Sequence, residues 1–144
     1  MKKITFFLIS ILLTSCSEMK DISAIKDAEN ITVCLLSAEV YTKESQDATK
    51  EYLEKREILR TLDLKGEQRI SFLKEFLDVN NYEPLSRKCD FEPVYALLVN
   101  DKLFALLDVE YCPTMEYVNN KKSAKYIGIT TENTLKKLLD DNLK

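Results

Sequence analysis

The side chains that could carry acid–base or nucleophilic chemistry are few in this chain of 144 residues. It contains 24 aspartates and glutamates and four cysteines but no histidine. The lack of histidine excludes serine and cysteine triads of the usual kind, histidine general bases and most catalytic zinc sites. Carboxylate or thiol chemistry remains, and the fold has to bring such groups together for a site to form.

Asp108 and Glu110 are the carboxylates whose spacing suits shared acid–base work. Because they lie two residues apart on a predicted strand, they point to the same side of a sheet. We favour the simpler interpretation that they form a solvated strand end. Cys34 lies in the apolar run VCLL, and we expect it to be a small buried hydrophobe. A nucleophilic or redox-active thiol is the alternative, although nothing nearby looks able to activate it.

Cys89 and Cys112 are placed to form a disulfide across a predicted hairpin. The apolar runs VYALLV and KLFALLDV flank an Asn-Asp pair at residues 100–101, and such pairs suit two-residue turns. With that turn Val99 faces Lys102, and the same register continued outwards brings Cys89 opposite Cys112. The bridge would close a loop of about 24 residues and contribute on the order of 3 kcal/mol to stability. The alternative is that the two thiols are free or paired differently.

Both faces of this hairpin are apolar in the predicted register. Residues that face each other across two strands point to the same side of the sheet. One face would carry Val94, Ala96, Leu98, Leu103, Ala105, Leu107 and Val109, and the other Tyr95, Leu97, Val99, Phe104 and Leu106. The second face must be covered or form an exposed patch. We therefore predict an interaction surface that includes Tyr95, Leu97, Phe104 and the nearby Tyr111, because aromatic residues are enriched at interfaces.

The first fifteen residues, MKKITFFLISILLTS, combine two lysines with a short apolar run. The run has roughly half of the 20 apolar residues that a membrane-spanning helix needs, and the pattern is typical of a secretory signal. It ends in Leu13-Thr14-Ser15-Cys16, which resembles the lipobox of bacterial lipoprotein precursors. The resemblance implies that the chain is cut before Cys16, that Cys16 carries lipid and, because Ser17 follows it, that the protein resides in the outer membrane. A conventional signal peptide is the alternative.

These features divide the chain into a lipoprotein signal peptide, residues 1–15, a lipidated amino terminus and polar tether, residues 16–30, and a single domain, residues 31–144. The tether SEMKDISAIKDAEN is polar and lacks a strong apolar face. Two or three acyl chains on Cys16 would anchor the protein durably. Loss of the signal peptide removes two lysines from a chain whose net charge is already −3. Nucleic acid is therefore not an expected partner.

The predicted domain is α+β, in the order β-β-α-β-β-β-α, with two helices on one face of a mostly antiparallel sheet. Apolar and β-branched runs predict strands over residues 31–41, 57–64, 94–99, 102–109 and 125–129. Apolar spacings of three and four predict helices over residues 66–79 and 131–142. The stripe of the first helix is Ile70, Leu73, Phe76 and Leu77. That of the second is Leu135, Leu138, Leu139 and Leu143, with Thr131 as its amino-terminal cap.

We therefore predict a lipid-anchored, non-enzymatic binding or interaction module that faces the periplasm and needs no cofactor and no metal. Its partners are the membrane, through lipid at Cys16, and an unidentified envelope protein or component. The alternatives are a small envelope enzyme that uses carboxylates or a thiol, and a carrier that holds a small apolar molecule against the hairpin in a closed pocket. The segment CDFEP at residues 89–93, followed by the hairpin and another cysteine, resembles a pattern of uncharacterised small bacterial lipoproteins, which implies no activity.

Overall fold

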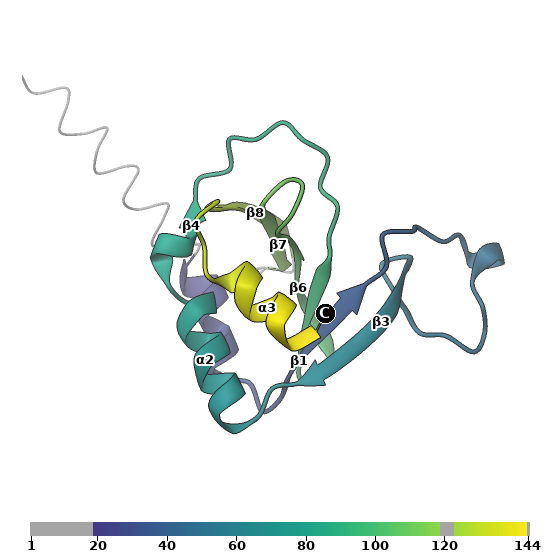
Figure 1. Ribbon diagram of the computed structural model, residues 1–144, viewed down its shortest axis with the longest axis horizontal. Helices are drawn as coiled ribbons and strands as arrows, with labels where there is room; N and C mark the ends of the chain where they lie inside the picture. The colour runs from purple at the N-terminus through teal and green to yellow at the C-terminus, as the bar shows by residue number, and fades with distance from the viewer. Residues whose placement is uncertain (1–18, 119–122, 144) are drawn as a thin grey trace, which may run out of the picture.

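The computed structural model describes residues 19–118 and 123–143 (Figure 1). Residues 19–23 are α-helical and continue into the 3-10 turn η1, Ala24–Asp27. The longer helices are α2, Gly66–Phe76, and α3, Leu135–Leu143, and two further 3-10 turns are η2, Lys43–Ser45, and η3, Val79–Asn81. The strands are β1 Ile31–Leu36, β2 Tyr52–Leu53, β3 Arg56–Asp63, β4 Tyr82–Glu83, β5 Tyr95–Val99, β6 Lys102–Asp108, β7 Thr114–Val118 and β8 Ala124–Ile129.

These strands form one antiparallel sheet in the order β2-β3-β1-β5-β6-β7-β8-β4. The predicted α+β class with a mostly antiparallel sheet is confirmed. The predicted order β-β-α-β-β-β-α is wrong, because β2, β4, β7 and a helical segment before β1 were not foreseen. Two of these strands are only two residues long, which is too short for alternation to show. The sequence of β7 is TMEYV, in which a central glutamate breaks the apolar run.

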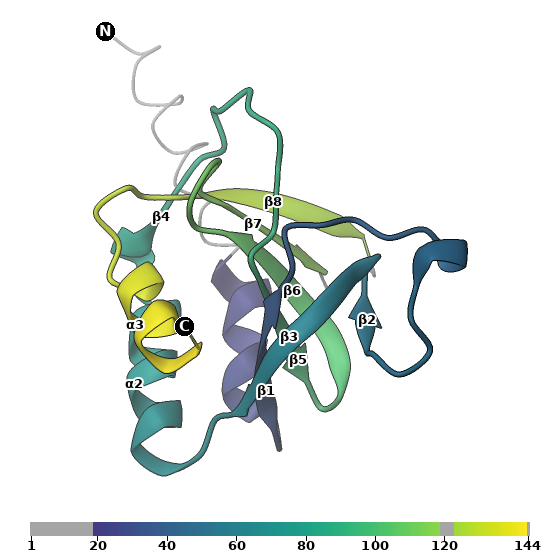
Figure 2. The same cartoon turned by 45° about the vertical axis from the view of Figure 1, so that its right-hand side comes forward.

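The helices pack on one face of the sheet and form a second layer (Figures 1 and 2). The hydrophobic core lies between these two layers. From the helical layer it takes Ile22 and Ile25 before β1, Phe72 and Phe76 of α2, and Leu135, Leu139 and Leu143 of α3. From the sheet it takes Val33, Tyr95, Leu97, Leu107, Met115, Tyr117, Ile127 and Ile129. The predicted layering is therefore confirmed, while the predicted count of two helices is wrong.

The segment before β1 belongs to the domain. Ile22 and Ile25 are fully buried in the core. Arg69 of α2 donates hydrogen bonds of 2.5 and 3.1 Å to two backbone carbonyls at the end of this segment. The polar tether predicted over residues 16–30 is therefore wrong for its described part, residues 19–30. Two isoleucines three residues apart share one face of a helix, and that narrow face is enough to dock it here.

The β5–β6 hairpin turns at residues 100–101, as predicted. Both residues have positive φ angles, 51° and 62°, as a two-residue hairpin turn requires. The first of them, an asparagine, accepts hydrogen bonds of 2.9 and 3.2 Å from backbone N–H groups just before β1. The turn therefore also fixes the point at which the amino-terminal segment enters the sheet.

A bulge in this hairpin reverses the predicted faces of β6 beyond Phe104. The register shifts between Leu97 and Leu98. Ala105 consequently faces Leu97 in the core, and Leu106 points to the opposite side of the sheet. The predicted faces are wrong for this part of β6, because one extra residue moves every following side chain to the other face.

The core face of α2 differs from the predicted stripe. Phe72 and Phe76 are buried and their rings stack with centroids 5.2 Å apart. Leu73 and Leu77 are only partly buried, and Ile70 is 61% exposed. The helix is therefore rotated towards the two phenylalanines, which bury more apolar area than the isoleucine would.

The apolar stripe of α3 is confirmed, but its start is not. Leu135, Leu139 and Leu143 are buried and Leu138 is partly buried. The helix begins at Leu135 rather than at Thr131, so the threonine is not its cap. The side chain of Asn133 accepts a hydrogen bond of 2.9 Å from a backbone N–H in the first turn, as a capping side chain does.

Candidate binding cavity

The predicted disulfide between Cys89 and Cys112 is present, with the two Cα atoms 5.8 Å apart. It joins the segment before β5 to the turn between β6 and β7. Arg87 supports the same connection by donating a hydrogen bond of 2.7 Å to the carbonyl oxygen of Pro113. The bulge breaks the register that suggested the pairing, but the two cysteines still meet at the same end of the hairpin.

Asp108 is a structural residue and not part of a solvated strand end. Its side chain has no solvent exposure. One carboxylate oxygen accepts hydrogen bonds from the backbone N–H groups of Glu92 and Cys112, at 3.0 and 3.1 Å. The other accepts from those of Glu110 and Tyr111, each at 3.0 Å. Asp108 therefore holds the turn that carries the disulfide, and its lone pairs are committed to the backbone.

Glu110 and Cys34 lie in surroundings of different kinds. Glu110 is partly exposed and forms an ion pair of 3.5 Å with Lys136. Cys34 is fully buried, as predicted. It lies on the outer face of the sheet, the face away from the helices. Burial, aided by the negative charges of Glu51 and Asp63, raises the pKa of the Cys34 thiol to about 11. Such a thiol is protonated at neutral pH and is a poor nucleophile.

The predicted interaction surface is not formed. Tyr95 and Leu97 are fully buried in the core, and Phe104 packs against it. The Tyr95 hydroxyl donates a hydrogen bond of 2.5 Å to Asp140 of α3, and burial together with this carboxylate raises the tyrosine pKa. Only Tyr111 of the four is exposed, at 72%. The prediction is wrong for Tyr95 and Leu97 because the helices pack on their face of the hairpin and bury it.

The outer face of the sheet has its own small apolar cluster. Its buried members are Cys34, Leu36, Ala96 and Leu106. The partly buried side chains that pack against them are Leu53, Ile58, Phe91, Leu98 and Leu103. Phe91, beside the disulfide, also meets Tyr126 of β8 edge to face, with ring centroids 6.0 Å apart. Part of this face is therefore covered by the chain itself.

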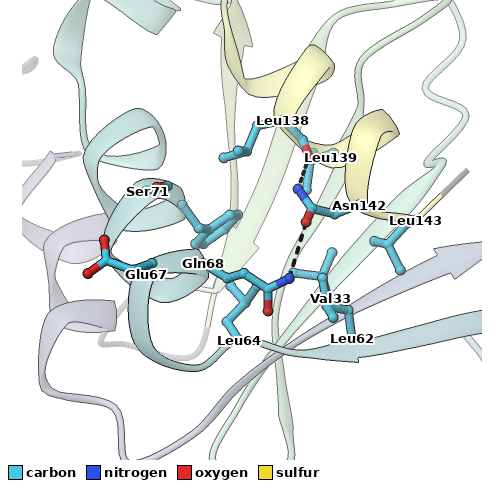
Figure 3. A pocket seen from close by; sticks show the side chains of 11 residues that line it. Val33, Leu62, Leu64, Glu67, Gln68, Ser71, Leu138, Leu139, Asn142 and Leu143 are labelled. Carbon is cyan, nitrogen blue, oxygen red and sulfur yellow. Dashed lines mark hydrogen bonds between the residues drawn. The ribbon is translucent and has the colours of Figure 1, made fainter.

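A cavity of about 220 Å³ opens between α2, α3 and the sheet (Figure 3). Its floor is apolar and is formed by Val33, Leu62, Leu64, Phe72, Leu138, Leu139 and Leu143. The two helices run antiparallel here, since the start of α2 meets the end of α3 through Gln68 and Asn142, and the end of α2 meets the start of α3 through Glu75 and Thr134. The cavity lies on the opposite side of the sheet from the outer cluster.

The mouth of the cavity is polar. Glu67, Gln68 and Ser71 of α2 and Asn142 of α3 line it and are exposed. Gln68 donates a long hydrogen bond of 3.4 Å to Asn142, whose own amide donates to the carbonyl oxygen of Leu138 at 2.7 Å (Figure 3). Glu67 is the one charged side chain among the lining residues. An apolar floor with a few convergent polar groups is the usual composition of a small-molecule site.

The cavity could not be predicted from the sequence, because the residues that line it come from four separate elements. Val33 and Leu62 belong to neighbouring strands, whereas the helices supply the walls. Ser71, a small polar residue between the isoleucine and phenylalanine of α2, is the one sequence feature that could have indicated a cavity beside this helix. Without the rotation of α2 about its axis, that residue could not be assigned to the cavity.

Membrane-spanning helices, metal ligands and relatives complete the description of the chain. No helix of residues 19–118 and 123–143 is long and apolar enough to cross a membrane. Within the same residues, no group of three or more histidine, cysteine, aspartate or glutamate side chains is close enough to hold a metal ion. The predicted lipidation site, Cys16, lies outside the described residues. Comparison of the chain with protein-family models, with curated proteins and with solved structures finds no match in any of the three.

Proposed function

We propose that the protein is a lipid-anchored, non-enzymatic binding module of the bacterial cell envelope that faces the periplasm. The anchor is supported by the resemblance of Leu13-Thr14-Ser15-Cys16 to a lipobox. A disulfide between Cys89 and Cys112 agrees with an exported protein, since such bonds persist mainly in oxidising compartments. We propose that it resides in the outer membrane, because Ser17 follows Cys16.

The cavity between α2 and α3 is the observation that carries the binding role. The three side chains that could act in catalysis lie elsewhere in the structure. Asp108 holds a turn, Glu110 pairs with Lys136, and Cys34 is buried with a raised pKa. None of these three lines the cavity. The cavity is instead apolar inside and neutral or acidic at its mouth, which suits binding without chemistry.

The anchored domain would lie close to the membrane. Residue 19 is already helical and Met19 packs against the core. Met19 follows Cys16 by three positions, and such a step spans at most about 10 Å when extended. The domain therefore has little freedom to move away from the lipid surface, in contrast to a domain on a long polar tether.

Fractionation of the full chain in a bacterial host tests the anchor. We expect the wild-type protein to remain in membranes that have been washed with alkaline carbonate. Cys16→Ala should lower this membrane-retained fraction at least tenfold, because it removes the acylated thiol. Ser17→Ala is the matched control and should leave retention unchanged. Equal retention of the wild type and Cys16→Ala would overturn the lipid anchor.

A further inference from the structure

We propose that the cavity between α2 and α3 binds one small neutral molecule that has an apolar body and a single hydrogen-bonding head group, such as an alcohol or an amide. The inference deepens the proposed binding function and rests on it. The apolar body would lie on the floor formed by Val33, Leu64 and Leu139, and the head group would lie at the mouth between the two helices.

The volume limits the size of this ligand. An engineered apolar cavity of about 150 Å³ is large enough to bind benzene. The cavity here, at about 220 Å³, is half as large again. It therefore suits a body of roughly six to ten non-hydrogen atoms, which is a short alkyl chain or a single substituted ring. A complete lipid does not fit, and a water cluster would find few polar partners on the apolar floor.

The mouth selects the head group. Gln68, Asn142 and Ser71 offer both donors and acceptors at the rim. The hydrogen bond between Gln68 and Asn142 is long, at 3.4 Å, so a ligand can replace it at little energetic loss. Glu67 is the one charged side chain among the lining residues, and its negative charge disfavours an anionic head such as that of a fatty acid.

The contacts of α3 keep the cavity open. Its start is held through the hydrogen bond between Thr134 and Glu75, and its last turn through Arg60, which donates to the carbonyl oxygen of Leu143 at 3.2 Å. On the sheet side, Tyr95 donates to Asp140. These contacts fix the helix at both ends. A pre-formed site of this kind binds without a large cost of ordering the protein.

Photoaffinity labelling of the lipidated full chain tests this assignment. The probe is 1-octanol with a diazirine in place of one methylene, and the labelled peptides are mapped by mass spectrometry. We expect the label on α2, α3 and β1, and we expect excess 1-octanol to compete at concentrations at least tenfold lower than octanoate at pH 7. Labelling spread over residues outside the lining would overturn the site, and equal competition by octanoate would overturn its preference for a neutral head.

Two variants place the same bulky side chain on neighbouring positions of α2. Ser71→Phe fills the cavity from its rim and should reduce labelling at least tenfold. Ile70→Phe is the matched control, because Ile70 is 61% exposed and does not line the cavity, and it should label like the wild type. Undiminished labelling of a folded Ser71→Phe variant would contradict the proposal. If that variant does not fold, the label map of the wild type decides alone.

Membrane retention of the same samples separates this inference from the proposed function. Retained wild-type protein without label in the cavity overturns the ligand assignment alone. Wild-type protein that is labelled in the cavity but is released from membranes supports the ligand assignment and overturns the anchor.

Discussion

Asp108→Asn is expected to destabilise the fold strongly although it keeps the size of the side chain. The carboxylate of Asp108 is fully buried and accepts four backbone hydrogen bonds of 3.0 to 3.1 Å. In asparagine one of the two oxygens becomes an NH2 group, which then faces two N–H donors. Two hydrogen bonds to a carboxylate are lost, at about 1.5–3 kcal/mol each. We therefore expect the free energy of unfolding to fall by about 3 to 6 kcal/mol.

Urea denaturation and thermal melting, both followed by circular dichroism, measure this loss. For a chain of this size, about 3 to 6 kcal/mol corresponds to a decrease in Tm on the order of 10–20 °C. Glu110→Gln is the matched control, because its ion pair with Lys136 spans 3.5 Å between partly exposed groups. Such a pair contributes less than about 1 kcal/mol. If Asp108→Asn lies within about 1 kcal/mol of the wild type, the structural role assigned to Asp108 is refuted.

Three other residue changes test the disulfide, the buried thiol and the contact between α3 and the sheet. Replacing Cys89 and Cys112 together by serine should lower the free energy of unfolding by about 3 kcal/mol, and urea denaturation with unchanged stability would show that the bridge does not form. Cys34 should resist thiol reagents at pH 8 until the protein unfolds. Because its pKa rises from 9.0 to about 11 on folding, the free energy of unfolding should fall as the pH rises from 9 to 11. In Cys34→Ala this decline should be smaller by on the order of 2 kcal/mol. An equal decline in the wild type and in Cys34→Ala would contradict the raised pKa. Tyr95→Phe loses the 2.5 Å bond to Asp140 and should cost about 1–2 kcal/mol in urea denaturation, whereas no change would mean that this bond does not hold α3.

The sequence was informative wherever a pattern is local. The apolar run of β1, the Asn-Asp turn at residues 100–101 and the leucine stripe of α3 each depend on neighbours within a few positions, and all three are found. The turn also brings Cys89 and Cys112 to the same end of the hairpin, where they pair although the bulge breaks the exact register. These are the elements that specify most of the sheet.

Features that depend on packing between distant segments were not predictable. The bulge after Leu97 exchanges the faces of β6, and nothing in the hairpin sequence marks an extra residue. The helical segment before β1 has only Ile22 and Ile25 to bury, so its stripe is too narrow to distinguish from a polar linker. Its place in the core appears only when the sheet that receives it is known.

The cavity, too, depends on packing between distant segments and could not be predicted from the sequence. Its floor joins strands β1 and β3 to two helices that lie far apart in the chain. Three of the candidate residues that the sequence offered, Asp108, Cys34 and Tyr95, are buried in structural roles. Residue type suggested chemistry at these positions, but burial and hydrogen bonding decide how they are used.

Peptide mass spectrometry of the protein extracted from membranes, without reduction, tests the anchored module most directly. We expect an amino-terminal peptide that begins at Cys16 and carries acyl chains, together with a linked pair of peptides that contain Cys89 and Cys112. An unmodified Cys16 within an uncleaved or differently cleaved chain would contradict the anchor. Free thiols at Cys89 and Cys112 would contradict the exported, disulfide-bonded domain on which the proposal rests.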